Sequence, residues 1–259
     1  MSNPSIDLNI EGNVAVLTMN NPPANTWTQD TLTALKDTVT ELNANKNVYA
    51  LVITGQGEKF FSAGADLNVF ASGDKGVAAT MSKVFGDAFE ALTNFRGVSI
   101  AAINGYAMGG GLEVALACDI RIAEEQAQMA LPEAKVGLLP CAGGTQNLAW
   151  LVGEGWAKRM ILCGERLKAD KAREIGLVEE VVGAGESLAA AMKLANQVGE
   201  QSPVAVTACK ELIQKGRTQP MAHALPLERE LFVQLFDTQD QKEGVNAFLE
   251  KRKANWVNS

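Results

Sequence analysis

Residues 100–123 read IAAINGYAMGGGLEVALACDIRIA, and this stretch decides the fold. The apolar run at 99–104 has the length of a strand, and Gly105 ends it. A triple glycine then opens an apolar helix at 112–118, and a second apolar run at 120–123 predicts another strand. A strand, a glycine-rich turn, a helix and a further strand in direct succession predict an α/β core.

The same alternation runs through the first hundred residues. Strands are predicted at 14–19 and 49–54, and helices at 28–42 and from about 78 to 95. The second of these strands is apolar throughout, which is typical of a strand covered on both faces. The sequence therefore predicts a sheet with helices on both sides.

The pattern changes beyond residue 142, where only 178–182 has the character of a strand. Six segments have helical character: 144–152, 155–163, 168–175, 186–200, 203–215 and 220–238. We predict an α/β core at 1–195 and a C-terminal helical region at 196–259. With no sheet left to cover, the apolar faces of these last helices either form an oligomer interface or pack back on the core.

Composition and charge exclude several classes of protein. The 259 residues are 47% hydrophobic and 20% charged, which rules out a disordered or collagen-like chain. The formal net charge of −7 argues against nonspecific nucleic-acid binding, but it leaves room for a small anionic ligand at a local positive site.

The four cysteines are too widely spaced to form a CxxC motif, and the chain has one histidine, His223. A disulfide framework, a structural zinc site or a histidine-based triad is therefore not expected. No run of about 18 apolar residues predicts a membrane span. Residues 1–12 lack the basic and apolar regions of a secretory signal. We expect a cytoplasmic protein that binds neither nucleic acid nor membrane.

Two glycine-rich segments follow predicted strands, at 62–66 (SAGAD) and 105–111 (GYAMGGG). The first lacks the GK[ST] of a P-loop, and the second spaces its glycines wrongly for a dinucleotide motif. Tight turns alone would explain either segment. The second, however, ends at a helix start, where free N–H groups and the helix dipole favour an oxygen that is or becomes anionic.

Two glutamates accompany these turns. Glu113 lies one helical turn after Gly110 and is the one charged residue in 109–118, among apolar neighbours that predict partial burial. Glu133 follows a predicted strand directly behind Pro132. Each also fits a structural role, because acidic residues are favoured in the first turn of a helix and proline often begins one.

Taken together, these segments resemble the enoyl-CoA hydratase/isomerase (crotonase) family from end to end. Residues 100–123 match its signature nearly throughout, and FSAGAD at 61–66 matches its other oxyanion segment. Pro132-Glu133, GGTQ at 143–146 and AFLEKRKAN at 247–255 match as well. The resemblance implies a crotonase-like spiral of ββα turns with a C-terminal helical oligomerisation region, usually assembled as trimers or hexamers.

The resemblance also implies a reaction and the residues that perform it. Members bind an acyl-CoA thioester and need no metal or redox cofactor, since coenzyme A is part of the substrate. Backbone N–H groups that match Ala65 and Gly110 would hold the thioester oxygen. Hydratases carry two glutamates, matching Glu113 and Glu133, whereas isomerases usually keep the second. We therefore expect an enoyl-CoA hydratase, acting in fatty-acid β-oxidation.

In this reading Glu113 orients and activates water, and Glu133 exchanges protons with the substrate, including protonation of the α-carbon. The residues expected to contact CoA or the acyl group are Lys59, Ala63, Gly64, Asp66, Leu67, Gly109, Cys141 and Lys251. Lys59 and Lys251 are candidates for the phosphates, and Lys251 matches a position that reaches CoA from a neighbouring subunit.

Three positions depart from the family pattern: Cys141 stands where hydratases usually carry glycine, Asn147 replaces a frequent arginine, and Trp27 is bulkier than usual. Cys141 keeps the backbone N–H that helps to hold water, but its side chain must fit the loop. Isomerisation or thioester hydrolysis would use the same oxyanion features. A non-catalytic RNA-binding relative is a further alternative, although it would be expected to carry a basic stripe.

Overall fold

The computed structural model describes residues 6–259 and confirms the α/β class. Its larger sheet has the strand order β1-β2-β3-β5-β7-β10, in which β1 and β2 are antiparallel and the other pairs are parallel. The six strands are β1 (Ile6–Glu11), β2 (Val14–Met19), β3 (Ala50–Gly55), β5 (Val98–Ile103), β7 (Ile120–Glu124) and β10 (Glu180–Val182).

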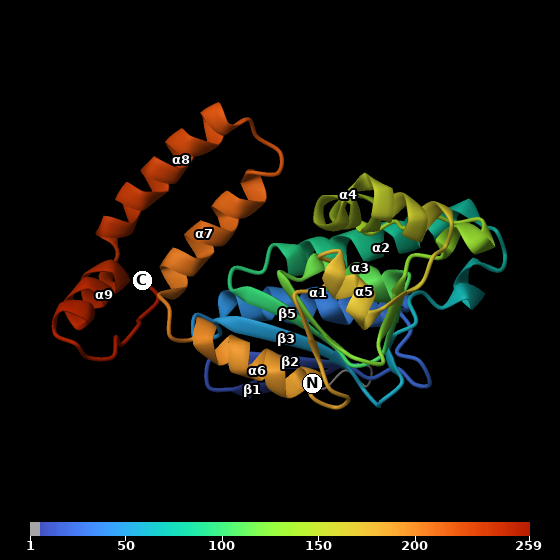
Figure 1. Ribbon diagram of the computed structural model, residues 1–259, viewed down its shortest axis with the longest axis horizontal. Helices are drawn as coiled ribbons and strands as arrows, with labels where there is room; N and C mark the ends of the chain where they lie inside the picture. Colours follow the sequence, from blue (N-terminus) through green and yellow to red (C-terminus); the bar gives the residue numbers. More distant parts are fainter. Residues whose placement is uncertain (1–5) are drawn as a thin grey trace.

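Helices cover both faces of this sheet, as the apolar strands predict. One face packs against α1 (Gln29–Ala44), α2 (Lys75–Thr93) and α3 (Gly110–Ala117), and α6 (Ser187–Val198) covers the other (Figure 1). All six residues of β3 are buried for this reason. The sheet is thus buried on both faces, and the ends of its strands fix the positions of the loops between strands and helices.

A second sheet is built from four very short strands: β4 (Phe60–Ser62), β6 (Tyr106–Met108), β8 (Gln128–Ala130) and β9 (Leu167–Lys168), in the order β4-β6-β8-β9. The sequence predicts two of these segments only as glycine-rich turns. Strands of two or three residues are too short to show alternation, so pairing with neighbours, rather than local pattern, creates them. This sheet aligns the turns that follow β4, β6 and β8.

The second half is mainly helical, as expected. Residues 144–162 form α4 (Gly144–Leu162), which breaks at Gly153, the point where the sequence predicts two helices. α5 (Ala169–Glu174) follows, and α7 (Pro203–Lys215), α8 (Met221–Gln234) and α9 (Gln239–Leu249) complete the chain. The last predicted helix, at 220–238, matches α8, whereas α9 lies outside the six predicted helical segments.

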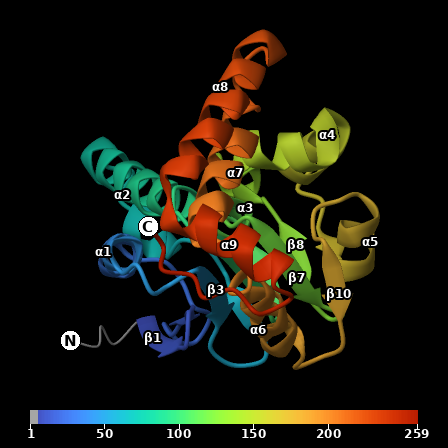
Figure 2. The same ribbon diagram turned by 90° about the vertical axis from the view of Figure 1, so that its left-hand side faces the viewer.

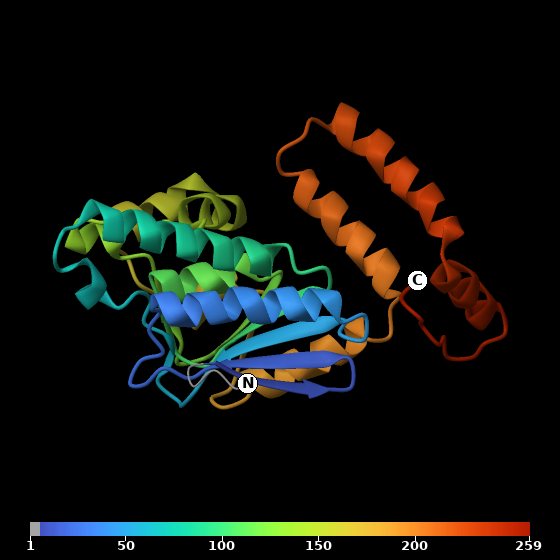
Figure 3. The same cartoon turned by 180° about the vertical axis from the view of Figure 1, so that it is seen from behind.

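The last three helices extend beyond the sheet and its covering helices, with α8 and α9 farthest out (Figures 1 and 3). We call α7, α8 and α9 the helical arm. In the view from the end of this arm, α9 and the chain end lie in front of the sheet (Figure 2). The large exposed apolar residues of the arm include Phe232, Phe236, Phe248 and Leu249. The expected boundary at 195/196 falls inside α6 and stays a prediction.

Lys210 fixes α7 to the core. Its Nζ donates hydrogen bonds to the carbonyls of Phe95 (2.6 Å) and Gly97 (3.0 Å), and it forms an ion pair with Asp119 at 2.7 Å. The Lys210 side chain is 11% exposed. One cation therefore joins the arm to the start of β5 and to the segment before β7.

We expect Lys210→Met to lower the free energy of unfolding by about 3 kcal/mol, because it removes the cation that pairs with Asp119 and donates to two carbonyls, and leaves the Asp119 carboxylate with its Ser99 donors. Urea denaturation measures this. Lys215→Met on the same helix is the control: its partner Glu211 is exposed, and such pairs contribute about 0–1 kcal/mol. Equal losses in the two variants would contradict the anchoring role.

Candidate active site

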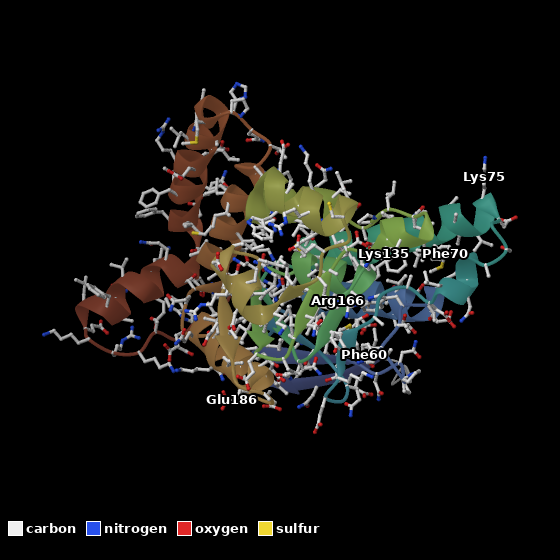
Figure 4. The ribbon with its side chains drawn as sticks, turned by 45° about the vertical axis from the view of Figure 1, so that its right-hand side comes forward. Phe60, Phe70, Lys75, Lys135, Arg166 and Glu186 are labelled. Atoms are coloured by element: carbon white, nitrogen blue, oxygen red, sulfur yellow. The ribbon has the colours of Figure 1, made fainter. Side chains whose placement is uncertain are left out.

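A cavity of about 720 Å³ lies among α2, the turn between β6 and α3, and the segment that follows β8. Its walls include Ala65, Phe85, Gly110, Glu113 and Glu133. Phe70, Lys135 and Arg166 belong to the same lining and lie on this side of the molecule (Figure 4). Elements from four parts of the chain therefore meet at one hollow.

The cavity exists because two backbone segments come into direct contact. A Cβ atom on Gly64, whose φ is +87°, would lie 2.6 Å from the Met108 carbonyl oxygen and 3.0 Å from the Gly110 nitrogen. A Cβ atom on Gly111 would collide with the Ser62 carbonyl. Only glycine allows this approach, which brings residues 62–65 beside the start of α3.

This arrangement leaves two backbone N–H groups without an acceptor among residues 6–259. Trp27 and Ala65 form a parallel bridge in which Trp27 N donates to the Gly64 carbonyl at 2.8 Å and Asp66 N donates to the Trp27 carbonyl at 3.0 Å. The bridge does not use the N–H of Ala65 itself. Gly110 begins α3, where an N–H has no intrahelical acceptor. Both residues line the cavity.

Glu113 is buried on α3, with 3% of its surface exposed. Its Oε1 accepts hydrogen bonds from the backbone N–H groups of Ala142 (2.8 Å) and Gly144 (2.9 Å). Burial raises the pKa of Glu113, and these donors oppose the shift. The carboxyl is thus held in one orientation on the cavity wall, which explains the burial that its apolar neighbours predict.

Glu133 begins a 3₁₀ turn (Glu133–Val136) directly after β8 and Pro132. Both of its carboxyl oxygens are buried, and neither has a hydrogen-bond partner within residues 6–259. A Cβ atom on Gly109 would lie 3.1 Å from Oε1, so the carboxyl sits against the turn that leads to Gly110. Burial, helped by the charge of Glu113, raises the pKa of Glu133 to about 7.

Cys141 lies on the cavity wall, close enough to Glu113 and Glu133 for both charges to act on its thiol. Burial and the charges of Glu113 and Glu133 raise the pKa of its thiol to about 11. A protonated thiol is a poor nucleophile. The one histidine, His223, is on α8 and outside the cavity lining, so it does not form a cysteine–histidine pair with Cys141.

Comparison with known proteins decides the family. Residues 9–259 match the model of the enoyl-CoA hydratase/isomerase family. The chain belongs to this family. It is 41% identical to the short-chain-enoyl-CoA hydratase of Clostridium acetobutylicum over 96% of each chain, and 40% identical to the crotonyl-CoA hydratase of Syntrophomonas wolfei over 99% of each.

A solved structure agrees with this family assignment and with the crotonase fold. Pseudomonas aeruginosa DspI superimposes with a TM-score of 0.97 at 63% identity, over 99% of this chain and 98% of that one. The fold expected from the sequence resemblance is therefore confirmed.

The structure brings most of the expected site residues of this family member together. Those that line the cavity are Ala63, Ala65, Leu67, Gly109, Gly110, Glu113, Glu133 and Cys141. Gly64 and Asp66 lie in the same loop but outside the lining. Lys59 lies over the ring of Phe60, and Lys251 follows α9 on the extended arm. The roles of all these residues stay predictions.

The sequence reasoning missed Arg166, which lines the cavity just before β9. Its guanidinium carbon lies 5.8 Å from the centroid of the Tyr106 ring, and it forms no ion pair with any residue in 6–259. Only the pairing of β9 with β8 brings this residue to the site, so no local motif marks it.

Within 6–259, no group of three or more His, Cys, Asp or Glu side chains is arranged to hold a metal ion. None of the helices in that range combines the length and apolar character needed to cross a membrane.

We expect the carboxyl of Glu133 to titrate near pH 7 and to titrate lower in Glu113→Gln, because that variant removes a neighbouring negative charge. Carbon-13 NMR of labelled glutamate side chains measures the shift, and the signal that disappears in Glu133→Gln assigns it. Titration at the ordinary value of 4.5 would contradict the burial of this carboxyl.

Proposed function

We propose that this chain is an enoyl-CoA hydratase, which adds water across the 2,3 double bond of a 2-enoyl-CoA thioester to give a 3-hydroxyacyl-CoA. One observation carries the proposal: two buried carboxyl groups, Glu113 and Glu133, share a cavity with two free backbone N–H groups. The names of the curated relatives, a short-chain-enoyl-CoA hydratase and a crotonyl-CoA hydratase, support the same activity.

The N–H groups of Ala65 and Gly110 form the proposed oxyanion hole. When water adds to the β-carbon, negative charge moves through the conjugated system to the thioester oxygen. Two fixed donors stabilise that charge better than they stabilise the uncharged carbonyl, which lowers the barrier. Loss of one such donor typically costs about 2.7–4 kcal/mol.

The two carboxyl groups divide the proton transfers. Glu113, with Oε1 held by two backbone donors, orients the water and takes its proton as the new C–O bond forms. Glu133, with a pKa of about 7, holds the proton that passes to the α-carbon. The Cys141 side chain borders the water position, so it limits the space there without taking part in proton transfer.

The CoA moiety would lie along the other end of the cavity. Ala63, Gly64, Asp66 and Leu67 are proposed to flank the adenine and pantetheine, with Gly109 beside the thioester. The phosphates need cations, and we assign Arg166 to them together with Lys59. Lys251 would reach the CoA of a neighbouring subunit in a trimer or hexamer built on the apolar arm.

Double-bond isomerisation is the main alternative, since it needs the same oxyanion donors. Isomerisation requires one carboxyl group, which moves a proton between two carbons, whereas this cavity contains two carboxyl groups. RNA binding is disfavoured by the net charge of −7. Fatty-acid β-oxidation, a cytoplasmic location, the oligomeric state and independence from added cofactors stay predictions.

We expect the wild-type protein to convert crotonyl-CoA to 3-hydroxybutyryl-CoA, followed by the loss of enoyl absorbance and by product analysis. Glu113→Gln and Glu133→Gln should each lower kcat by about 10²–10⁴-fold, because each removes a proton-transfer group. Glu125→Gln, an exposed residue outside the cavity, is the control. Full hydration by Glu133→Gln would overturn its assignment, and double-bond migration without hydration would favour the isomerase.

We expect Arg166→Gln to raise KM for crotonyl-CoA about 3- to 10-fold with little change in kcat, because an exposed ion contact contributes about 1 kcal/mol. The KM for crotonyl-pantetheine, which lacks the nucleotide phosphates, should not change. Arg173→Gln on α5 is the matched control. Equal effects on both substrates would place Arg166 at the acyl or pantetheine part instead.

A further inference from the structure

The two proposed oxyanion donors come from different elements, so their separation must be fixed by something that contacts both. Ala65 lies in the loop after β4, and Gly110 begins α3. Trp27, in the loop before α1, contacts the two segments at once. We propose that Trp27 is the positioning residue of the oxyanion hole, holding Ala65 with its main chain and Gly110 with its ring.

The main chain of Trp27 fixes the first donor. Hydrogen bonds on either side of Ala65 tie its loop to Trp27, at 2.8 Å to Gly64 and 3.0 Å from Asp66. These bonds set the orientation of the peptide between Gly64 and Ala65, whose N–H is the donor. The same pairing continues upstream, where Ala63 N donates to the Ala24 carbonyl at 2.9 Å.

The loop that carries Trp27 is itself held firmly. The side-chain amide of Asn25 donates to the Phe60 carbonyl at 2.9 Å, and Ser62 Oγ donates to the Asn25 carbonyl at 2.7 Å. On the other side, Thr28 caps α1. The hydrogen bonds of Asn25 to the β4 segment and the start of α1 thus hold the chain on both sides of Trp27. The backbone position from which its ring projects is therefore fixed.

The ring of Trp27 backs the second donor. A Cβ atom on Gly110 would lie 3.5 Å from Trp27 Cδ1 and 3.0 Å from Phe85 Cε1. The ring edges of Trp27 and Phe85 therefore fill the space into which a side chain at position 110 would project. Gly110 cannot retreat into the core while these rings are present, so its N–H stays directed at the cavity.

Packing alone holds the indole in this place. Trp27 is 2% exposed, and its ring meets Phe89 edge-on with centroids 5.7 Å apart. Phe89 in turn packs edge-on against Phe85 at 5.7 Å. The indole Nε1 is buried and has no hydrogen-bond partner among residues 6–259. The ring acts through its size, which predicts that phenylalanine, without an N–H, preserves much of the effect.

This inference rests on the proposed oxyanion hole, and a chromophoric thioester tests the two separately. 4-Dimethylaminocinnamoyl-CoA absorbs at longer wavelength when hydrogen bonds polarise its carbonyl. We expect a red shift on binding to the wild-type protein, most of that shift in Trp27→Phe, and little in Trp27→Leu and Trp27→Ala. For crotonyl-CoA, Trp27→Ala should lower kcat about 10- to 100-fold and change KM less than about 3-fold, as expected for a displaced donor.

Phe95→Ala is the matched control, because Phe95 is a fully buried aromatic residue that does not line the cavity. It should lose stability while keeping kcat per folded molecule and the red shift. Trp27→Leu, scored per folded molecule, serves if Trp27→Ala does not fold. A full red shift and full kcat in folded Trp27→Leu would overturn the role of Trp27. Absence of a red shift in the wild type would instead overturn the oxyanion hole itself.

Discussion

The close approach of residues 62–65 to the start of α3 is the constraint on which the rest of the site depends. At Gly64 and Gly111 no side chain fits between the two backbones. Because backbone atoms meet directly, N–H groups from two distant segments can serve one ligand atom. Side-chain donors would have to be ordered against their rotamer freedom, whereas peptide N–H groups in fixed turns are oriented before any ligand binds.

The two sheets fix the position of residues 62–65 relative to the start of α3. The larger sheet supplies β3 and β5 as buried, parallel strands, and the short strands β4 and β6 continue from them and pair with each other. One glycine-rich turn follows β4 and the other follows β6. Because β4 and β6 are paired, the two turns lie side by side. The loop of Trp27 contacts both turns, through its main chain at Gly64 and Asp66 and through its ring at Gly110.

The sequence predicted most of the larger sheet, because runs such as 14–19 and 49–54 are long enough to show their apolar character. It could not predict the second sheet, since β8 and β9 have too few residues for any period and are formed by tertiary pairing. Glu113 and Glu133 were found through motif and resemblance. Arg166 and the backing role of Trp27 were not, because both depend on which segments the fold brings together. Cys141 was found as a departure, yet only its surroundings explain why its thiol stays protonated.

Burial of two carboxyl groups in one cavity has a chemical consequence for the proposed reaction. Two negative charges in this apolar space repel each other, so the pair favours a state that keeps one proton. In the proposed hydration, the proton that starts on Glu133 passes to the α-carbon, and Glu113 ends with a proton taken from the water. Dehydration runs between the same two states in reverse. The pair of carboxyl groups therefore carries one proton before and after each reaction. This agrees with a hydration that neither takes up nor releases a proton overall. Within residues 6–259 the carboxyl oxygens of Glu133 have no hydrogen-bond partner, whereas Oε1 of Glu113 accepts two backbone hydrogen bonds, which favour the charged form of Glu113. The proposed mechanism therefore places the proton of the free enzyme on Glu133, where burial raises the pKa to about 7, and leaves Glu113 to accept a proton from water.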